Sequence, residues 1–79
     1  MKIGKLYHLM YGIPLYNSAP ISSNSYLFMA EKGDVMLILK EIKAEECDVI
    51  KILTKEGIIC WSQFLYRNGS EYYFKLLEQ

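Results

Sequence analysis

The sequence has few of the residues that build metal centres and disulfide frameworks. It contains one histidine and two cysteines, and the spacing of Cys47 and Cys60 is not that of paired zinc ligands. If the two strands predicted below form a hairpin, Cys60 faces Ile52 and Cys47 lies near Leu65, which is poor geometry for a disulfide. We therefore expect two reduced, buried thiols, no metal and no cofactor.

Long apolar runs and an excess of one charge are also missing. No window approaches the ~20 apolar residues of a membrane span, and residues 1–6 lack the apolar core of a signal peptide. We expect a cytoplasmic protein, with a virion as the alternative location. Nine basic and nine acidic residues are interspersed, so binding to nucleic acid through phosphate neutralisation is not expected. Near-neutral charge favours a protein partner or self-association.

No catalytic grouping can be recognised. His8 has no nucleophile or acid partner that the sequence can identify. The serine-rich residues 22–25 lack the G-x-S-x-G elbow of hydrolases, and Glu45, Glu46 and Asp48 lack the loop geometry that divalent cations need. We therefore expect a protein that is not an enzyme.

Apolar residues dominate the chain instead. Hydrophobic residues make up 52% and aromatic residues 14% of the 79 residues, which is too apolar for a disordered chain at zero net charge. A chain of this length supports one hydrophobic core. We expect residues 1–79 to form a single folded domain.

Short apolar segments bounded by turn residues predict an all-β fold of five to six antiparallel strands. The predicted strands are residues 6–11, 26–30, 35–42, 49–54, 58–64 and 71–77. A helix is the competing interpretation of residues 35–47. The turn residues Lys55-Glu56-Gly57 predict a hairpin, with Gly57 where a left-handed backbone is often needed.

Two further expectations concern the ends and the longest connection. The last predicted strand pairs with the first, which closes the sheet and hides both edges. Residues 17–25 carry Asn, Ser and Pro at most positions, which predicts a long surface loop.

These segments resemble the SH3-like small barrels over roughly residues 13–65. Residues 14–18 look like the ALYDY segment of Src-homology domains, and Lys32-Gly33-Asp34 looks like their diverging turn. Gly57 and Trp61 are similar to the turn glycine and tryptophan of the bacterial counterparts. The resemblance implies a small barrel that binds other proteins, and a free-standing protein of the phage type.

The sequence also departs from these families. Asp48-Val49 stands where peptide-binding Src-homology domains carry a tryptophan, and residues 62–66 lack their proline. These residues build the grooves for a polyproline helix. Cys60 replaces the glycine that precedes the tryptophan in the bacterial pattern. The departures argue against recognition of proline-rich peptides.

We predict a non-catalytic protein-interaction module, because loops on a rigid scaffold carry function while strands carry packing. The predicted binding residues flank the serine-rich loop and the diverging turn, or are aromatic: Tyr16, Tyr26, Asp34, Trp61 and Tyr66. Core packing is the competing interpretation of Trp61, and cover for a thin core is that of the tyrosines. The alternative functions are a structural subunit that pairs through an exposed strand edge, and a binder of single-stranded nucleic acid by aromatic stacking.

Overall fold

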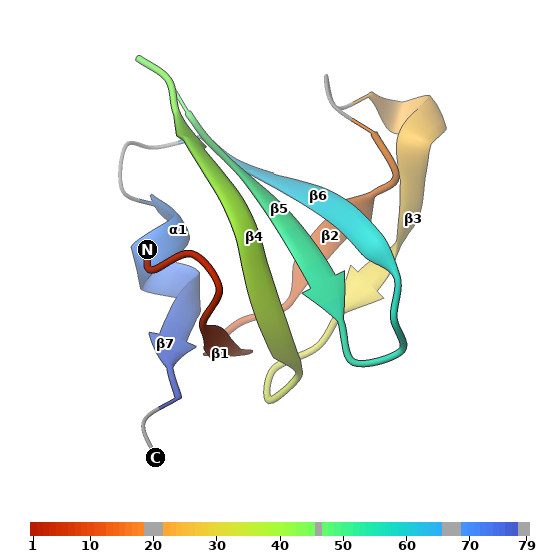
Figure 1. Cartoon of the computed structure of the whole chain (residues 1–79). Coiled ribbons are helices and arrows are strands. Elements are labelled where there is room, and N and C mark those ends of the chain that lie inside the picture. Colours follow the sequence, from red (N-terminus) through yellow and green to blue (C-terminus); the bar gives the residue numbers. More distant parts are fainter. Residues whose placement is uncertain (19–21, 46, 66–68, 78–79) are drawn as a thin grey trace.

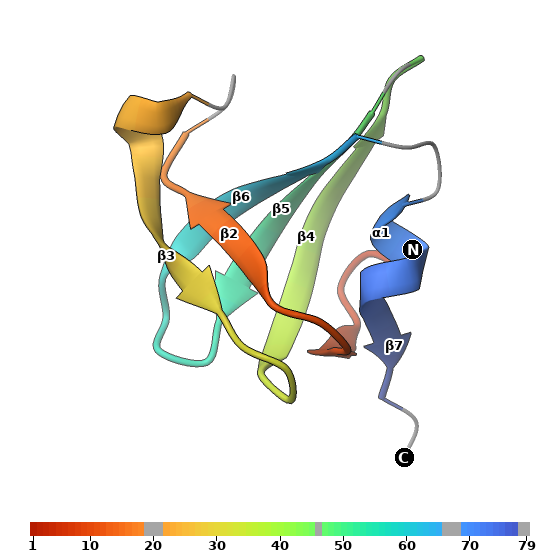
Figure 2. The same cartoon turned by 180° about the vertical axis from the view of Figure 1, so that it is seen from behind.

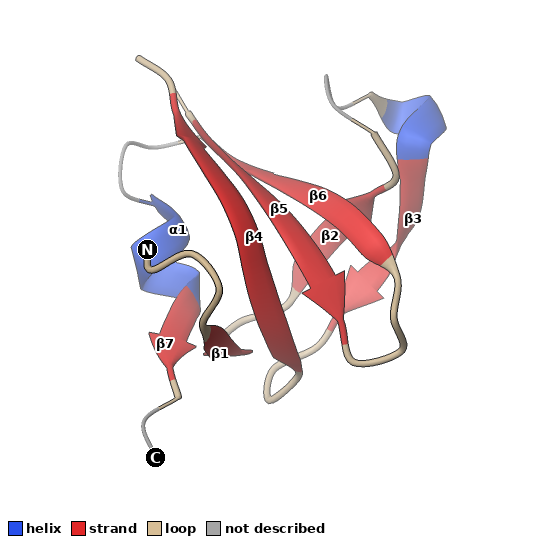
Figure 3. Ribbon diagram, viewed as in Figure 1, coloured by secondary structure: helices blue, strands red, loops and turns tan. Residues whose placement is uncertain are grey.

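The computed structural model describes residues 1–18, 22–45, 47–65 and 69–77 and is all-β apart from two short helices. Its elements are β1 (Leu6–Leu9), β2 (Ile13–Tyr16), a 3-10 helix (Ser23–Ser25), β3 (Tyr26–Ala30), β4 (Val35–Lys43), β5 (Asp48–Thr54), β6 (Ile59–Phe64), α1 (Gly69–Tyr73) and β7 (Phe74–Leu76). Figure 3 shows the strands in red and the helices in blue. The strands form one antiparallel sheet in the order β3-β2-β6-β5-β4-β1-β7.

The hairpin of β5 and β6 has the predicted register. Gly57 has a φ of +86°, which an L side chain rarely adopts, and the Ile58 N–H donates to the Thr54 hydroxyl over 3.1 Å. This turn places Cys60 opposite Ile52. Alternate residues of β5 are buried along its whole length, as expected for a strand with one face on a core.

The sheet curls so that one face becomes the interior. β2 passes behind β4, β5 and β6 in Figure 1 and in front of them in Figure 2. The residues that fill the space between these strands are at most 6% exposed: Tyr7, Leu9, Ile13, Leu15, Ala30, Met36, Ile38, Ile50, Ile52, Cys60, Phe64 and Phe74. The opposite face of the sheet, here called the outer face, points away from this core.

Several expectations about the strands need correction. The sheet has seven strands rather than five or six, because Ile13–Tyr16 forms a separate strand, β2. The predicted strand over residues 71–77 begins only at Phe74, because residues 69–73 form α1. Ser23–Ser25, expected in a loop, forms a 3-10 helix, and residues 19–21 lie outside the described part.

The expected pairing of the chain ends is confirmed, but the sheet does not close. β7 pairs with β1, with Tyr7 opposite Leu76. β3 and β7 occupy the two ends of the strand order, and no pairing joins them within the described residues. The strand interpretation of residues 35–42 is confirmed, since β4 extends to Lys43. No helix in the described part of the chain has the length and apolar character needed to cross a membrane.

Candidate functional site

A row of side chains crosses the outer face of five neighbouring strands. Tyr26 on β3 lies opposite Tyr16 on β2, and Tyr16 lies opposite Trp61 on β6. Trp61 in turn lies opposite Lys51 on β5, which lies opposite Lys40 on β4. Directly opposed residues of an antiparallel sheet have side chains on the same face, so the five form one continuous strip. We call it the outer-face row.

The aromatic half of the row is partly open to solvent, and its two tyrosines are in contact. The rings of Tyr16 and Tyr26 meet edge to face with centroids 5.9 Å apart, a favoured geometry for aromatic pairs. Tyr26 is 48% exposed, and Tyr16 and Trp61 are half-buried. Trp61 is therefore not a core residue, because Cys60 and Ser62 on either side of it point inward.

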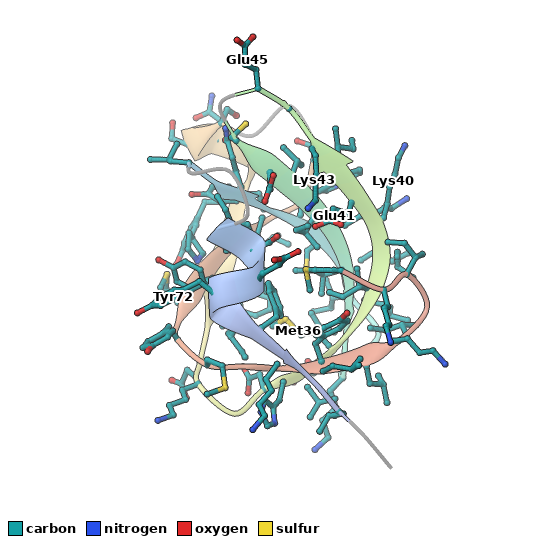
Figure 4. The ribbon with its side chains drawn as sticks, turned by 90° about the vertical axis from the view of Figure 1, so that its left-hand side faces the viewer. Met36, Lys40, Glu41, Lys43, Glu45 and Tyr72 are labelled. Carbon is teal, nitrogen blue, oxygen red and sulfur yellow. The ribbon has the colours of Figure 1, made fainter. Side chains whose placement is uncertain are left out.

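The basic half of the row consists of Lys51 and Lys40. The Lys51 ammonium lies 5.5 Å from the centroid of the Trp61 ring, within the range of a cation–π interaction. Lys40 points away from the molecule in Figure 4, whereas Glu41 lies on the side that faces α1. Within the described residues neither Lys40 nor Lys51 forms an ion pair with a carboxylate. Two opposed ammonium groups repel each other, and a bound anion would relieve that repulsion.

The row contains three of the five predicted binding residues. Asp34 lies elsewhere, in the turn at the far end of β3 from Tyr26, where its Oδ2 accepts a hydrogen bond from the Glu31 N–H over 2.9 Å. That bond closes the turn. Tyr66 lies outside the described residues.

The sequence interpretation missed both lysines of the row. Lys51 could have been found, since the Gly57 turn fixes the register that opposes it to Trp61. Lys40 could not, because β4 has an irregularity between Ile38 and Lys40 that shifts the pairing by one residue. Such a bulge changes which face a side chain occupies and leaves no clear mark in the sequence.

Beside the row, the outer face carries a second, aliphatic strip. Leu6, Leu37, Leu53 and Ile59 oppose one another on β1, β4, β5 and β6. Part of this strip lines a shallow hollow of about 460 Å³. Ile59 is 54% exposed, so the outer face offers apolar as well as basic contacts.

A smaller groove opens where β2 and β6 separate. It has a volume of about 210 Å³ and is lined mainly by the start of β2, the end of β6 and α1. Near it, Tyr11 and Tyr72 stack in parallel with ring centroids 5.0 Å apart. The hydrogen bond with Tyr11 raises the pKa of Tyr72 above its ordinary value. Neither tyrosine lines the groove, and none of its described lining residues is charged.

A buried polar cluster joins α1 to the sheet. The Ser70 hydroxyl lies 3.2 Å from Oδ2 of Asp48 and 3.3 Å from Oε2 of Glu41. The other Glu41 oxygen accepts from the terminal amine of Met1 over 2.8 Å. Asp48 is fully buried, and within the described part of the chain its Oδ1 has no hydrogen-bond partner. No group of three metal-ligating side chains gathers here or elsewhere in the described ranges. These hydrogen bonds hold α1 against β4 and β5.

The two cysteines differ in accessibility. Cys60 is fully buried, and burial raises the pKa of its thiol from 9.0 to about 11. Cys47, expected to be buried, is only half-buried, and the Gln63 side-chain amide donates to its sulfur over 3.3 Å. Both thiols are free, as expected.

This difference predicts selective thiol labelling. At pH 8 we expect a disulfide reagent such as DTNB to modify one thiol of the native protein quickly and both thiols in guanidinium chloride, because the thiolate is the reactive form. A Cys47→Ser variant should lose the fast phase. The buried thiol of Cys60 holds its proton more tightly in the folded than in the unfolded protein. Its contribution to stability is therefore complete below pH 9.0 and is lost as the pH rises through about 11. Two fast thiols in the native protein would contradict this assignment.

A scan against protein-family models, a search of curated proteins and a search of solved structures each found no match to this chain.

Proposed function

We propose that this domain is a non-catalytic protein-interaction module whose binding surface is the outer-face row. Its partner would be an extended protein segment that carries acidic side chains next to apolar or aromatic ones. The observation that carries the proposal is the alignment of Tyr26, Tyr16 and Trp61 with Lys51 and Lys40 on one exposed face. Tryptophan and tyrosine are among the side chains that most often dominate binding energy in protein interfaces, and a neighbouring cation can add an interaction with the ring face.

The fold interpretation supports the same proposal. We infer that the curled sheet is a variant of the SH3-like small barrels, and that the phage-type origin implied by that resemblance holds as well. Gly57 has the expected positive φ, Gly33 in the turn before β4 also has a positive φ, and the hairpin of β5 and β6 has the expected order. Related barrels bind protein segments across an exposed aromatic surface. Without the proline-binding residues, the basic half of the row would set the preference for acidic segments.

Trp61 gives a direct readout of binding. It is the single tryptophan of the chain and lies in the middle of the row, so a ligand there should change its fluorescence. We would select dodecapeptides from a display library that lacks tryptophan and titrate the selected peptides against the protein. We expect acidic and aromatic residues to be enriched among the peptides selected.

Substitutions in the row should weaken these peptides. Tyr26→Ala and Lys40→Glu should each raise the dissociation constant about tenfold, because each removes a contact worth about 1.4 kcal/mol. Tyr72→Ala is the matched control, since Tyr72 is also an exposed tyrosine but belongs to α1. Equal affinity for the wild-type protein and both row variants would show that the binding surface is elsewhere.

One observation favours a second candidate, a binder of single-stranded nucleic acid. Three aromatic rings followed by two lysines without carboxylate partners among the described residues could stack bases and contact phosphates. The same fluorescence titration with oligo(dT) at two salt concentrations distinguishes the candidates. Binding that weakens steeply with salt favours nucleic acid, and binding of peptides alone favours the protein module.

A further inference from the structure

We propose that β3 is a self-association surface through which two copies of this chain pair edge to edge. β3 lies at one end of the strand order and pairs only with β2 among the described strands. Figure 1 shows it at the rim of the molecule, beyond β2. This inference does not depend on the function proposed for the outer-face row.

The side chains of β3 are exposed to an unusual degree for a strand. Tyr26, Leu27, Phe28 and Met29 are four consecutive apolar residues, each at least 36% exposed. Proteins protect an edge strand with lysine, proline, an inward charge or a β-bulge, and β3 has only an irregularity at Leu27, which no residue of β2 opposes. An apolar edge of this kind is a template for another strand.

The backbone of β3 has hydrogen-bonding groups that no other described strand uses. The Ser62 hydroxyl donates to the Pro14 carbonyl over 2.9 Å, so this carbonyl points toward β6 and away from β3. Met29 lies opposite Pro14. In an antiparallel pair, two opposed residues whose backbone N–H and C=O groups point away from each other occupy a non-hydrogen-bonded position. The N–H and C=O of Met29 therefore point out of the sheet at its free edge.

The sequence of β3 fits a copy of itself. An antiparallel pair with its two-fold axis at Phe28 sets Phe28 opposite Phe28 of the second copy and overlaps all five residues, including the irregularity of β3 at Leu27. Tyr26 then faces Ala30, and Leu27 faces Met29. The outward groups of Met29 occupy a hydrogen-bonded position in this register, as the backbone requires. Beyond the strand, Glu31 faces Ser25, so no like charges are opposed.

The opposite edge of the sheet lacks this fit. β7 contains Phe74, Lys75 and Leu76, and a two-fold pair centred on this strand would place Lys75 against Lys75. Like charges in direct opposition disfavour the pairing. The zero net charge of the chain leaves little long-range repulsion to oppose association through β3. A second copy on β3, rather than on β7, is therefore the favoured occupant.

The pairing should be reversible. A five-residue strand pair buries less than the standard protein interface of about 1,600 Å². We therefore expect a dimer that forms at high concentration and dissociates on dilution. Sedimentation equilibrium from about 10 μM to 1 mM should show the average mass rising from 9.2 kDa toward twice that value. A mass that stays at 9.2 kDa throughout this range overturns the proposal.

Substitution of Met29 tests the role of the edge. Met29→Pro removes an N–H that no other strand of the described sheet uses, so the monomer should still fold while the dimer loses a hydrogen bond from each copy. Met29→Lys places a charged side chain on the edge strand, and it provides the same test if the Met29→Pro variant fails to fold. Either variant should raise the dimer dissociation constant at least tenfold. Ile59→Lys is the matched control, since Ile59 is 54% and Met29 52% exposed.

A cysteine placed on the axis tests the register. In a Cys47→Ser background, Phe28→Cys should form a disulfide-linked dimer under mild oxidation, because position 28 faces itself in the second copy. Tyr26→Cys should form far less, because position 26 faces position 30. Equal cross-linking of the two variants, or a dimer that Met29→Lys and Ile59→Lys weaken alike, would place the contact elsewhere and overturn the proposal.

Discussion

Replacing Ile52 with alanine should lower the free energy of unfolding by about 3–4 kcal/mol. Ile52 is fully buried at the centre of β5, between Ile38 on β4 and Cys60 on β6. Alanine would remove three carbon atoms from the core and leave a cavity that two flanking strands cannot easily fill. A small domain has only about 5–15 kcal/mol of stability, so the loss would be a large share of the total.

Ile59→Ala is the control for this prediction. Ile59 lies in the same hairpin and loses the same atoms on substitution, but it is 54% exposed and faces away from the core. We expect a loss below about 1 kcal/mol in urea denaturation, with the same dependence on denaturant for both variants. A similar loss for Ile52→Ala and Ile59→Ala would mean that the inner face of the sheet is not the core.

The hairpin could be predicted from the sequence because its signals are local. Gly57 lies between two apolar segments, and alternation along β5 sets one face toward the core. The bounds of β3 could be predicted for a similar reason, since turn residues follow Ala30. In these segments the turn and the strand pattern agree.

β2 could not be predicted because its signals conflict. Pro14 lacks an N–H and is normally excluded from a central strand. It is tolerated because β2 pairs with β6 at only one position, Tyr16 opposite Trp61, and because Pro14 faces Met29 at a non-hydrogen-bonded position of β3. The gap between β2 and β6 therefore removes the need for a donor at Pro14. No local pattern predicts such a gap.

Recognition of the outer-face row requires both the local sequence signals and the register of the strands. Tyr16 and Tyr26 stand out because they flank a polar segment, but their contact depends on the register of β2 and β3. The bulge in β4 then decides that Lys40 completes the row. The sequence therefore identifies aromatic residues of the row, but only the strand pairing in the structure shows that the row lies on one face of the sheet.

Ser70→Ala should lower the free energy of unfolding by about 2 kcal/mol, although alanine favours a helix more than serine does. The Ser70 hydroxyl is buried within reach of both Asp48 and Glu41, and having one proton it donates to one of them at a time. Its removal leaves the carboxyl group of Asp48 buried without that donor, while Oδ1 already has no partner among the described residues. The sequence predicts strand for residues 71–73 as well, because the hydrogen bond that holds α1 joins residues 22 positions apart and leaves no local signal.

Glu71→Ala separates this effect from a general weakening of α1. Glu71 is the next residue and forms an ion pair with Lys43 at 3.6 Å, with about half of each side chain exposed. Exposed pairs contribute little, so we expect a loss below about 0.5 kcal/mol. Thermal or urea unfolding of both variants gives the comparison. Hydrogen exchange should also show faster exchange of α1 in Ser70→Ala than in Glu71→Ala, because only the former loses the buried contact between α1 and β5. Equal stability of the two variants would mean that the helix is held by Phe64, Tyr73 and the other aromatic side chains packed around it, with the hydroxyl contributing nothing measurable.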